Sequence, residues 1–251
     1  MGKAITKGSV LERFKAAKLY AITMAPAQGD YESMVRQACE GGVDILQFRD
    51  KSLAQRRDRF ELASRLREIC KACGVLFIVN DYLEVAMACE ADGVHLGQDD
   101  LKTDVVRRIL HQNGVGNFLV GRSTHSLDQA KQAEQEGADY IGIGPVFETP
   151  TKPMYQAVGL ELVRQVTSQV ATPHVAIGGI DAANVKQVLA AGAERVAVVR
   201  AVCGAADITV ATRQMKQLMS SPAVIGRGSI NKALLMDSPP VSAGNDRGRT
   251  E

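Results

Sequence analysis

Residues 43–51 read Val-Asp-Ile-Leu-Gln-Phe-Arg-Asp-Lys, an apolar run that ends in polar and charged side chains. Alternate side chains of a strand point to the same face, so Gln47, Arg49 and Lys51 are predicted to share one face. Two cations and an amide donor at the end of a buried strand indicate an anion site, for phosphate or pyrophosphate. Whether Lys51 faces that anion or turns outward depends on where the strand ends.

The same alternation of a short apolar run and a longer amphipathic stretch recurs along the chain. It predicts eight strands, each followed by a helix, which begin near Leu19, Asp44, Leu76, Gly93, Phe118, Asp139, His174 and Arg195. Short strands rich in Val, Ile and Leu are typical of parallel strands buried on both faces. Eight such units in 251 residues predict an α/β fold with a single (β/α)₈ TIM barrel.

The predicted barrel spans residues 19–219. Residues 1–18 are a short N-terminal extension, in which residues 10–17 are expected to form a helix over the bottom of the barrel. Residues 220–251 carry Ser-Pro, Pro-Pro and glycine-rich steps without a sustained period. We therefore expect a disordered C-terminal tail.

Composition narrows the class of protein. Hydrophobic residues make up 45% of the chain but aromatic residues only 4%, so the core must be aliphatic. A net charge of +2 gives no strong attraction to nucleic acid or to an anionic membrane. The sequence lacks an apolar run of about 18 residues and an apolar leader, which favours a cytoplasmic protein with reduced thiols. Cys70 and Cys73 form a CxxC pair without a second pair of zinc ligands, so a structural role is favoured and redox pairing stays open.

In a barrel of this type the functional side chains follow the strands. The residues at those positions are Gln47, Arg49, Lys51, Asn80, Asp81, Gln98, Asp99, Asp100, Arg122, Ser123, Thr124, His125, Thr149, Thr151, Lys152, Gly178, Gly179 and Arg200. His125 is a candidate general base that also begins a predicted helix. His95 lies within a strand, where a buried core histidine is expected.

Asp81 and Asp100 follow neighbouring predicted strands, so their carboxylates are expected to converge. Two carboxylates suit Mg²⁺, which keeps several waters and takes substrate phosphate oxygens as further ligands. Each aspartate also stands just before a predicted helix, where it would serve as an N-cap. The adjacent anion site favours the metal over the cap.

A second anion site is predicted at Gly178-Gly179 and the loop after the eighth strand. Backbone N–H groups at this place in a barrel commonly bind phosphate, and glycine allows a close approach. A simple tight turn would have the same sequence. The hydroxyl-rich loop 147–153 either closes over a bound anion or is an ordinary surface loop.

Eight motifs in order carry a family resemblance: LYAIT (19–23), QFRDK (47–51), ND (80–81), GVHLGQDD (93–100), GRSTHS (121–126), DYIGIGPVFETPTK (139–152), VAIGGI (175–180) and RVAVV (195–199). The set resembles the thiamine phosphate synthase family. The resemblance implies a Mg²⁺-dependent transferase that couples the diphosphate ester of a hydroxymethyl aminopyrimidine with a thiazole phosphate. Its products are thiamine phosphate and pyrophosphate, and its substitution is dissociative, without a covalent nucleophile.

The resemblance also implies residue roles. Arg49, Lys51, Ser123 and Lys152 would be catalytic, and Asp81 and Asp100 would bind the metal. The implied substrate-binding residues are Gln47, Phe48, Arg49, Asp50, Lys51, Asn80, Ser123, Thr149, Pro150, Thr151, Lys152, Gly179, Val199 and Arg200. Met24 and Arg200 depart from the family pattern, since a polar residue and a Ser are common there.

Two other functions fit parts of this pattern. A thiazole tautomerase-like relative would bind thiazole phosphate and use a general base, without the metal and pyrophosphate residues. A non-catalytic, thiazole-phosphate-binding barrel would sense its ligand and need neither carboxylate. Small molecules are the expected partners, with no nucleic acid or membrane, and homo-oligomer formation stays open.

Overall fold

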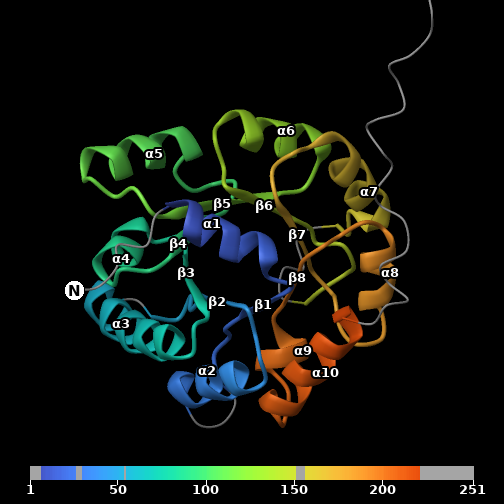
Figure 1. Cartoon of the computed structure of the whole chain (residues 1–251), viewed down its shortest axis with the longest axis horizontal. Coiled ribbons are helices and arrows are strands. Elements are labelled where there is room, and N and C mark those ends of the chain that lie inside the picture. Colours follow the sequence, from blue (N-terminus) through green and yellow to red (C-terminus); the bar gives the residue numbers. More distant parts are fainter. Residues whose placement is uncertain (1–6, 27–29, 54, 151–155, 221–251) are drawn as a thin grey trace, which may run out of the picture.

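Eight parallel strands form a closed barrel in the computed structural model, which describes residues 7–26, 30–53, 55–150 and 156–220. The strands are β1 Leu19–Ile22, β2 Ile45–Phe48, β3 Leu76–Asn80, β4 Gly93–Leu96, β5 Leu119–Thr124, β6 Tyr140–Ile143, β7 His174–Ile177 and β8 Val196–Val198. Each strand pairs with the next, and Leu19 of β1 pairs with Val196 of β8 to close the ring (Figure 1). The predicted (β/α)₈ barrel is confirmed.

Helices surround the strands (Figure 1). They are α2 Tyr31–Glu40, α3 Arg56–Ala72, α4 Leu83–Ala88, α5 Thr103–Gln112, α6 Leu127–Gln135, α7 Gly159–Gln169, α8 Val185–Ala190, α9 Arg200–Cys203 and α10 Ile208–Ser220. The short α9 directly after β8 was not expected from the sequence. Helix α10 includes Ser220, and the segment 221–251, where we expect a tail, lies outside the described residues. None of the helices in the described part of the chain is long and apolar enough to span a membrane.

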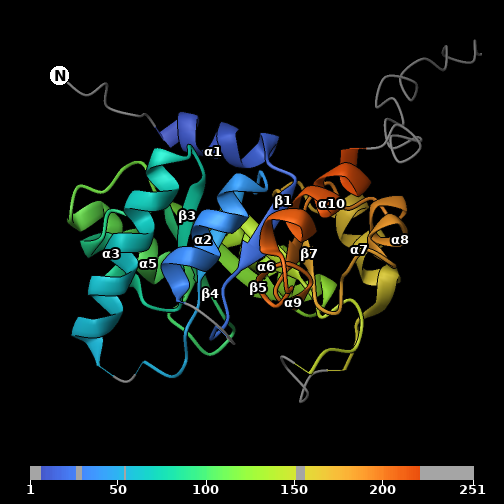
Figure 2. The ribbon, with the colours of Figure 1, turned by 90° about the horizontal axis from the view of Figure 1, so that it is seen from below.

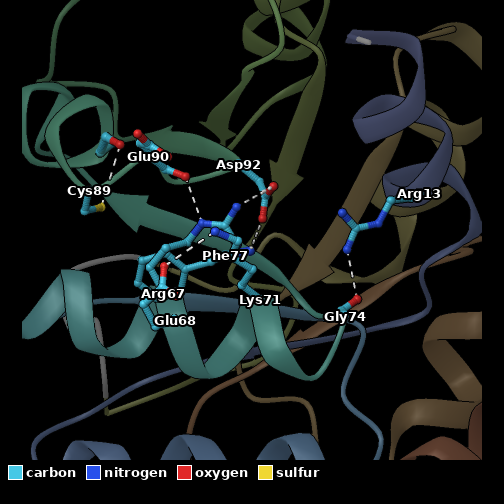
Figure 3. Close-up of polar contacts among 10 residues, drawn as sticks. Arg13, Arg67, Glu68, Lys71, Gly74, Phe77, Cys89, Glu90 and Asp92 are labelled. Atoms are coloured by element: carbon cyan, nitrogen blue, oxygen red, sulfur yellow. Dashed lines mark hydrogen bonds and ion pairs between the residues drawn. The ribbon is translucent and has the colours of Figure 1, made fainter. Parts of the chain in front are cut away.

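A further helix, α1 (Lys7–Ala16), lies across the end of the barrel where the strands begin (Figure 2). Its Phe14 ring packs into the barrel with its centroid 4.4 Å from that of Tyr140. Its Arg13 donates a hydrogen bond of 2.8 Å to the carbonyl oxygen of Gly74 (Figure 3). Helix α1 therefore covers the bottom of the barrel and contributes to its inner core.

The inner and outer faces of the strands build two apolar layers. The outer layer packs against the helices, and the inner layer joins Tyr20, Ile45, Ile78 and Tyr140 to α1. Gly121 is required in the inner layer, because a Cβ there would lie 2.1 Å from the Tyr140 ring. The glycine thus gives room for a large aromatic side chain in the centre of the barrel.

Carboxylates fix the bottom edge of the barrel. In Figure 3, Asp92 accepts a 2.8 Å hydrogen bond from the backbone N–H of Phe77 and a 3.4 Å one from Arg67. Arg67 also donates to the carbonyl oxygen of Glu90 at 2.8 Å. The aspartates that precede β2 and β6 make the same kind of bond to the strand before them. Asp44 accepts from the Leu19 N–H of β1, and Asp139 accepts from the Val120 N–H of β5. These aspartates hold the strand register and are remote from the open end.

Candidate active site

A cavity of about 930 Å³ lies among the loops that follow the strands, at the end opposite α1. Most of the residues expected at the site line it, although they come from several different strand ends. These residues are Gln47, Arg49, Lys51, Asn80, Asp81, Asp100, Ser123, Thr149, Gly179, Val199 and Arg200. The expected Thr151 and Lys152 lie outside the described residues.

Three residues expected to bind substrate do not line this cavity. Phe48 points outward from β2, and its ring packs edge-on against Tyr31 at 5.9 Å. Asp50 accepts hydrogen bonds of 2.6 Å from the Tyr31 hydroxyl and from the Ser52 backbone N–H. Pro150 is exposed. Because side chains alternate along a strand, Phe48 and Asp50 face away when Gln47 and Arg49 face inward. Asp50 holds the loop that carries the cations.

Gln47, Arg49 and Lys51, which were predicted to share one face, lie at two different depths of the cavity. Strand β2 ends at Phe48, so only Gln47 belongs to the strand. Its side chain is 2% exposed and donates a 2.8 Å hydrogen bond to the Tyr20 hydroxyl, at the floor of the cavity. Arg49 and Lys51 follow the end of the strand, and both line the cavity.

The carboxyl groups of Asp81 and Asp100 lie within hydrogen-bonding reach of each other. Asp81 has a φ of 65°, in the left-handed region, and its N–H donates to the His95 carbonyl oxygen at 2.9 Å. Burial raises the pKa of Asp81 to about 6, the charge of Asp100 acts in the same direction, and Lys51 and Arg49 oppose the shift. A cation between the two carboxylates would relieve their repulsion.

Neither aspartate caps the helix that follows it. The N-caps of α4 and α5 are Tyr82 and Lys102, and no side-chain capping bond is made at either in the described structure. The described residues contain no group of three or more His, Cys, Asp or Glu side chains that fits a metal. A pair of carboxylates that leaves the other positions to water and phosphate oxygens fits Mg²⁺ and does not fit zinc.

A chain of hydrogen bonds crosses the cavity floor from Gln47 to Ser123. The Tyr20 and Tyr140 hydroxyls are 3.1 Å apart, Tyr140 is 3.1 Å from His95 Nδ1, and His95 Nε2 is 2.9 Å from Ser123 Oγ. His95 was expected to be a buried core histidine, but it is half-buried and lines the cavity. Tyr20 and Tyr140 were missed. Gly121, opposite Tyr140 in β5, was a sequence signal for a ring inside the barrel.

The opposite wall is built by two loops that approach closely. Gly178 and Gly179 have φ values of 101° and 65°. A Cβ on Gly178 would lie 2.4 Å from Pro145, and one on Gly179 would lie 2.6 Å from the carbonyl oxygen of Glu148. The N–H of Phe147 donates to the Gly178 carbonyl oxygen at 3.0 Å. The glycines therefore hold the loop after β6 beside β7, which brings the Thr149 and Gly179 sides of the cavity together.

His125 lies on the wall between these two regions. Its Nδ1 forms a hydrogen bond with the carbonyl oxygen of Gly144, and its backbone N–H donates to the Gln129 side chain at 2.7 Å. These bonds tie the loop after β5 to the end of β6. They give His125 a structural role in the cavity wall.

Comparisons with known proteins identify the family of this chain. The family model described as thiamine monophosphate synthase matches residues 19–202. A thiamine-phosphate synthase of Chloroflexus aurantiacus is 44% identical over 206 residues, which cover 81% of this chain and 93% of the relative. One of Thermosynechococcus vestitus is 42% identical over 210 residues, and the match covers 84% of this chain but 58% of that longer relative.

A solved structure of a relative has the same overall fold. The thiamine phosphate pyrophosphorylase of Pyrococcus furiosus superposes with a TM-score of 0.76 at 38% identity, over 86% of this chain and 100% of that one. The family match includes every strand and every described residue that lines the two sides of the cavity. This chain therefore belongs to the thiamine monophosphate synthase family.

Proposed function

We propose that this chain joins the diphosphate ester of a hydroxymethyl aminopyrimidine to a thiazole phosphate, with release of thiamine phosphate and pyrophosphate. One observation carries the proposal: the Asp81–Asp100 pair lies beside Arg49 and Lys51 in the same cavity as the Gly178-Gly179 wall. In this proposal one cavity holds two separate anion sites, as a reaction between two phosphorylated substrates requires. Family membership supports the same reaction.

In the proposed complex the aminopyrimidine ring lies on the floor, beside Gln47 and Ser123. Its diphosphate lies against Arg49, Lys51 and Asn80, and Lys152 is proposed to join them. The thiazole phosphate is assigned to the opposite wall, to Thr149, Thr151, Gly179 and the backbone at Val199 and Arg200. Arg200 begins α9 and is exposed, so its guanidinium adds a charge at the edge of this wall.

Asp81 and Asp100 are proposed to hold Mg²⁺. When bound, the ion neutralises charge on the diphosphate and so makes pyrophosphate a better leaving group. The two carboxylates leave the remaining coordination positions to water and phosphate oxygens. Arg49 and Lys51 lie near enough to Asp81 to oppose its pKa shift, which supports the proposal that they contact the same phosphates.

The proposed substitution is dissociative. The bond between the methylene carbon and the diphosphate oxygen breaks first, and its electron pair leaves with pyrophosphate. The amino group of the pyrimidine donates electron density to the cation, and the thiazole nitrogen then attacks the methylene carbon. Arg49 and Lys51 stabilise the charge that develops on the leaving group. This reaction needs no nucleophilic side chain, and the hydrogen-bonded floor fixes Ser123 beside the ring.

A tautomerase-like reaction is not favoured. It would need a general base at the thiazole phosphate and would have no use for the paired carboxylates or for the Arg49–Lys51 anion site. The test of the proposal is product identification. Purified protein incubated with both substrates and Mg²⁺ should yield thiamine phosphate by mass spectrometry, and failure to yield it with folded protein would refute the function.

Replacing Tyr140 by phenylalanine should lower kcat/KM by about 10-fold, the value of roughly one hydrogen bond. The change removes the hydroxyl that connects Tyr20 to His95 and so loosens the support of Ser123. Steady-state kinetics measure the effect. Thr167→Val is the control, because the Thr167 hydroxyl bonds to the carbonyl oxygen of Val163 outside the cavity. Equal losses in both variants would argue against a role for the floor network.

Replacing Gly179 by alanine should raise the KM for thiazole phosphate by about 10-fold and leave that for the pyrimidine diphosphate unchanged. The added methyl group meets the Glu148 carbonyl oxygen, at a φ that disfavours alanine. Gly42→Ala is the matched control, since Gly42 also has a positive φ of 89° but no atom within 4 Å of a Cβ. An increase in KM for the pyrimidine diphosphate alone would reverse the assignment of the two substrates to the two walls.

A further inference from the structure

A buried arginine lies directly behind the loop that carries Asp100. Arg122 belongs to β5 and pairs with Leu96 at the end of β4, where the loop of residues 97–102 begins. Its neighbour Ser123 lines the cavity, and side chains alternate along a strand, so Arg122 points to the outer side of the barrel. Arg122 is not among the described residues that line the cavity. The proposed reaction has so far given it no role.

The Arg122 guanidinium spans this loop. Its Nη1 donates a 2.8 Å hydrogen bond to the carbonyl oxygen of Leu101, and its Nη2 donates a 3.2 Å one to that of Gln98. Asp100 lies between these two residues in the chain. Hydrogen bonds from a charged donor are stronger than neutral ones, and water competes little for these, because Arg122 is only 6% exposed.

The loop is also held in the opposite direction. The Gln98 side-chain amide donates to the main-chain carbonyl oxygen of Ser123, the residue after Arg122. Within the loop, the Asp100 carboxylate accepts a 2.6 Å hydrogen bond from the Gly97 N–H, and its own N–H donates to the Gly97 carbonyl oxygen at 3.3 Å. The loop and the strand therefore fix each other, and the backbone of the same turn orients the carboxylate.

We propose that Arg122 is a positioning residue for the metal site, which holds Asp100 in place for Mg²⁺ through the two loop carbonyls. This inference rests on the proposed function, which assigns the ion to Asp81 and Asp100. A loop aspartate without such support would sample several positions, and only some of them bring its carboxylate to Asp81. Partners that orient metal ligands from outside the site commonly change metal affinity by about 10- to 100-fold.

Arg195 provides a matched control at the other end of the barrel. It is 4% exposed, and its guanidinium also donates to two main-chain carbonyl oxygens, those of Phe14 at 3.0 Å and of Lys15. Both carbonyls belong to α1. Loss of the Arg195 side chain therefore removes the same kind of contact without touching the loop of Asp100.

The test measures metal binding without turnover. Purified full-length protein without substrates is titrated with Mn²⁺, a paramagnetic substitute for Mg²⁺, and EPR records the loss of the free-ion signal. Arg122→Met should raise the Kd for Mn²⁺ by about 10-fold. Arg195→Met should keep the wild-type Kd and lower only the melting temperature. Arg122→Lys restores the charge but not the fork of donors, so its Kd should lie between those of the wild type and Arg122→Met.

A kinetic readout complements the binding data. In Arg122→Met, the Mg²⁺ concentration that gives half the maximal rate of pyrophosphate release should rise by the same factor as the Kd. The rate should recover at saturating Mg²⁺, because the residues that contact the substrates are unchanged. A loss of rate that Mg²⁺ does not restore, with the wild-type Kd for Mn²⁺, would contradict the positioning role.

The binding experiment can also overturn the proposal. Wild-type affinity for Mn²⁺ in folded Arg122→Met would do so, as would an equal loss of affinity in Arg195→Met or a wild-type chain that binds no Mn²⁺. If Arg122→Met does not fold, Arg122→Lys decides: weaker binding supports the role of Arg122, and wild-type binding refutes it. Mn²⁺ binding that depends on Arg122, without formation of thiamine phosphate, would refute the proposed reaction and leave the positioning role intact.

Discussion

Replacement of Asp81 by asparagine should lower kcat/KM by about 10³-fold while the barrel stays folded. The amide removes one of the two negative charges that hold the proposed Mg²⁺, and with it part of the charge stabilisation of the departing pyrophosphate. Asparagine tolerates the left-handed φ of 65° better than alanine does, so the backbone is preserved. The repulsion between Asp81 and Asp100 also disappears, so the melting temperature of the metal-free protein should not fall.

Pyrophosphate release measured across a Mg²⁺ series, with melting by circular dichroism, tests this expectation. Asp99→Asn is the matched control, because Asp99 lies next to Asp100 in the same loop and is exposed. We expect it to retain most of the rate. If Asp81→Asn releases pyrophosphate at the wild-type rate at saturating Mg²⁺, Asp81 is not a ligand of the metal.

Replacement of Arg49 by methionine should lower kcat by about 10²-fold with a smaller change in KM. Arg49 is half-buried and comes directly after the end of β2. The Thr23 hydroxyl fixes its backbone, accepting from the Arg49 N–H at 2.9 Å and donating to its carbonyl oxygen at 3.1 Å. A positioned cation of this kind stabilises the leaving group most strongly when its charge is greatest, in the transition state.

Steady-state kinetics with both substrates varied separate the two parameters. Arg49→Lys should recover part of the rate, because it restores the charge but not the planar fork of donors that a guanidinium offers to a phosphate. Arg57→Met serves as the control, since Arg57 is exposed on α3 and pairs with Glu61. A large KM increase with unchanged kcat would mean that Arg49 only binds the substrate.

The barrel was predictable because its signal is local and repeated. Each strand is a short apolar run, and the polar residues that follow it lie at the same end of a parallel sheet. That rule alone locates Asp81, Asp100, Ser123 and Gly179 at the open end of the barrel. It failed at the end of β2, because alternation puts Gln47 and Arg49 on one face but does not say that the strand ends at Phe48 and leaves Gln47 deeper, at the floor.

The floor of the site could not be predicted from local patterns. Tyr20 and Tyr140 are 120 positions apart, and their hydroxyls meet only because the barrel closes. His95 likewise reaches Ser123 from the neighbouring strand. Whether Asp81 caps a helix or faces the cavity also depends on the three-dimensional arrangement. An aspartate just before a helix looks the same in the sequence in both cases. Closure of the barrel decides each of these contacts.

The most direct test of the account is the stoichiometry of pyrophosphate release by the purified protein. With both substrates and Mg²⁺ present, we predict one pyrophosphate for each thiamine phosphate, and none when the metal is removed by chelation. Pyrophosphate release without formation of thiamine phosphate would contradict this account. Coupling of the two substrates that is unaffected by chelation would contradict the proposed role of Asp81 and Asp100 in the departure of pyrophosphate.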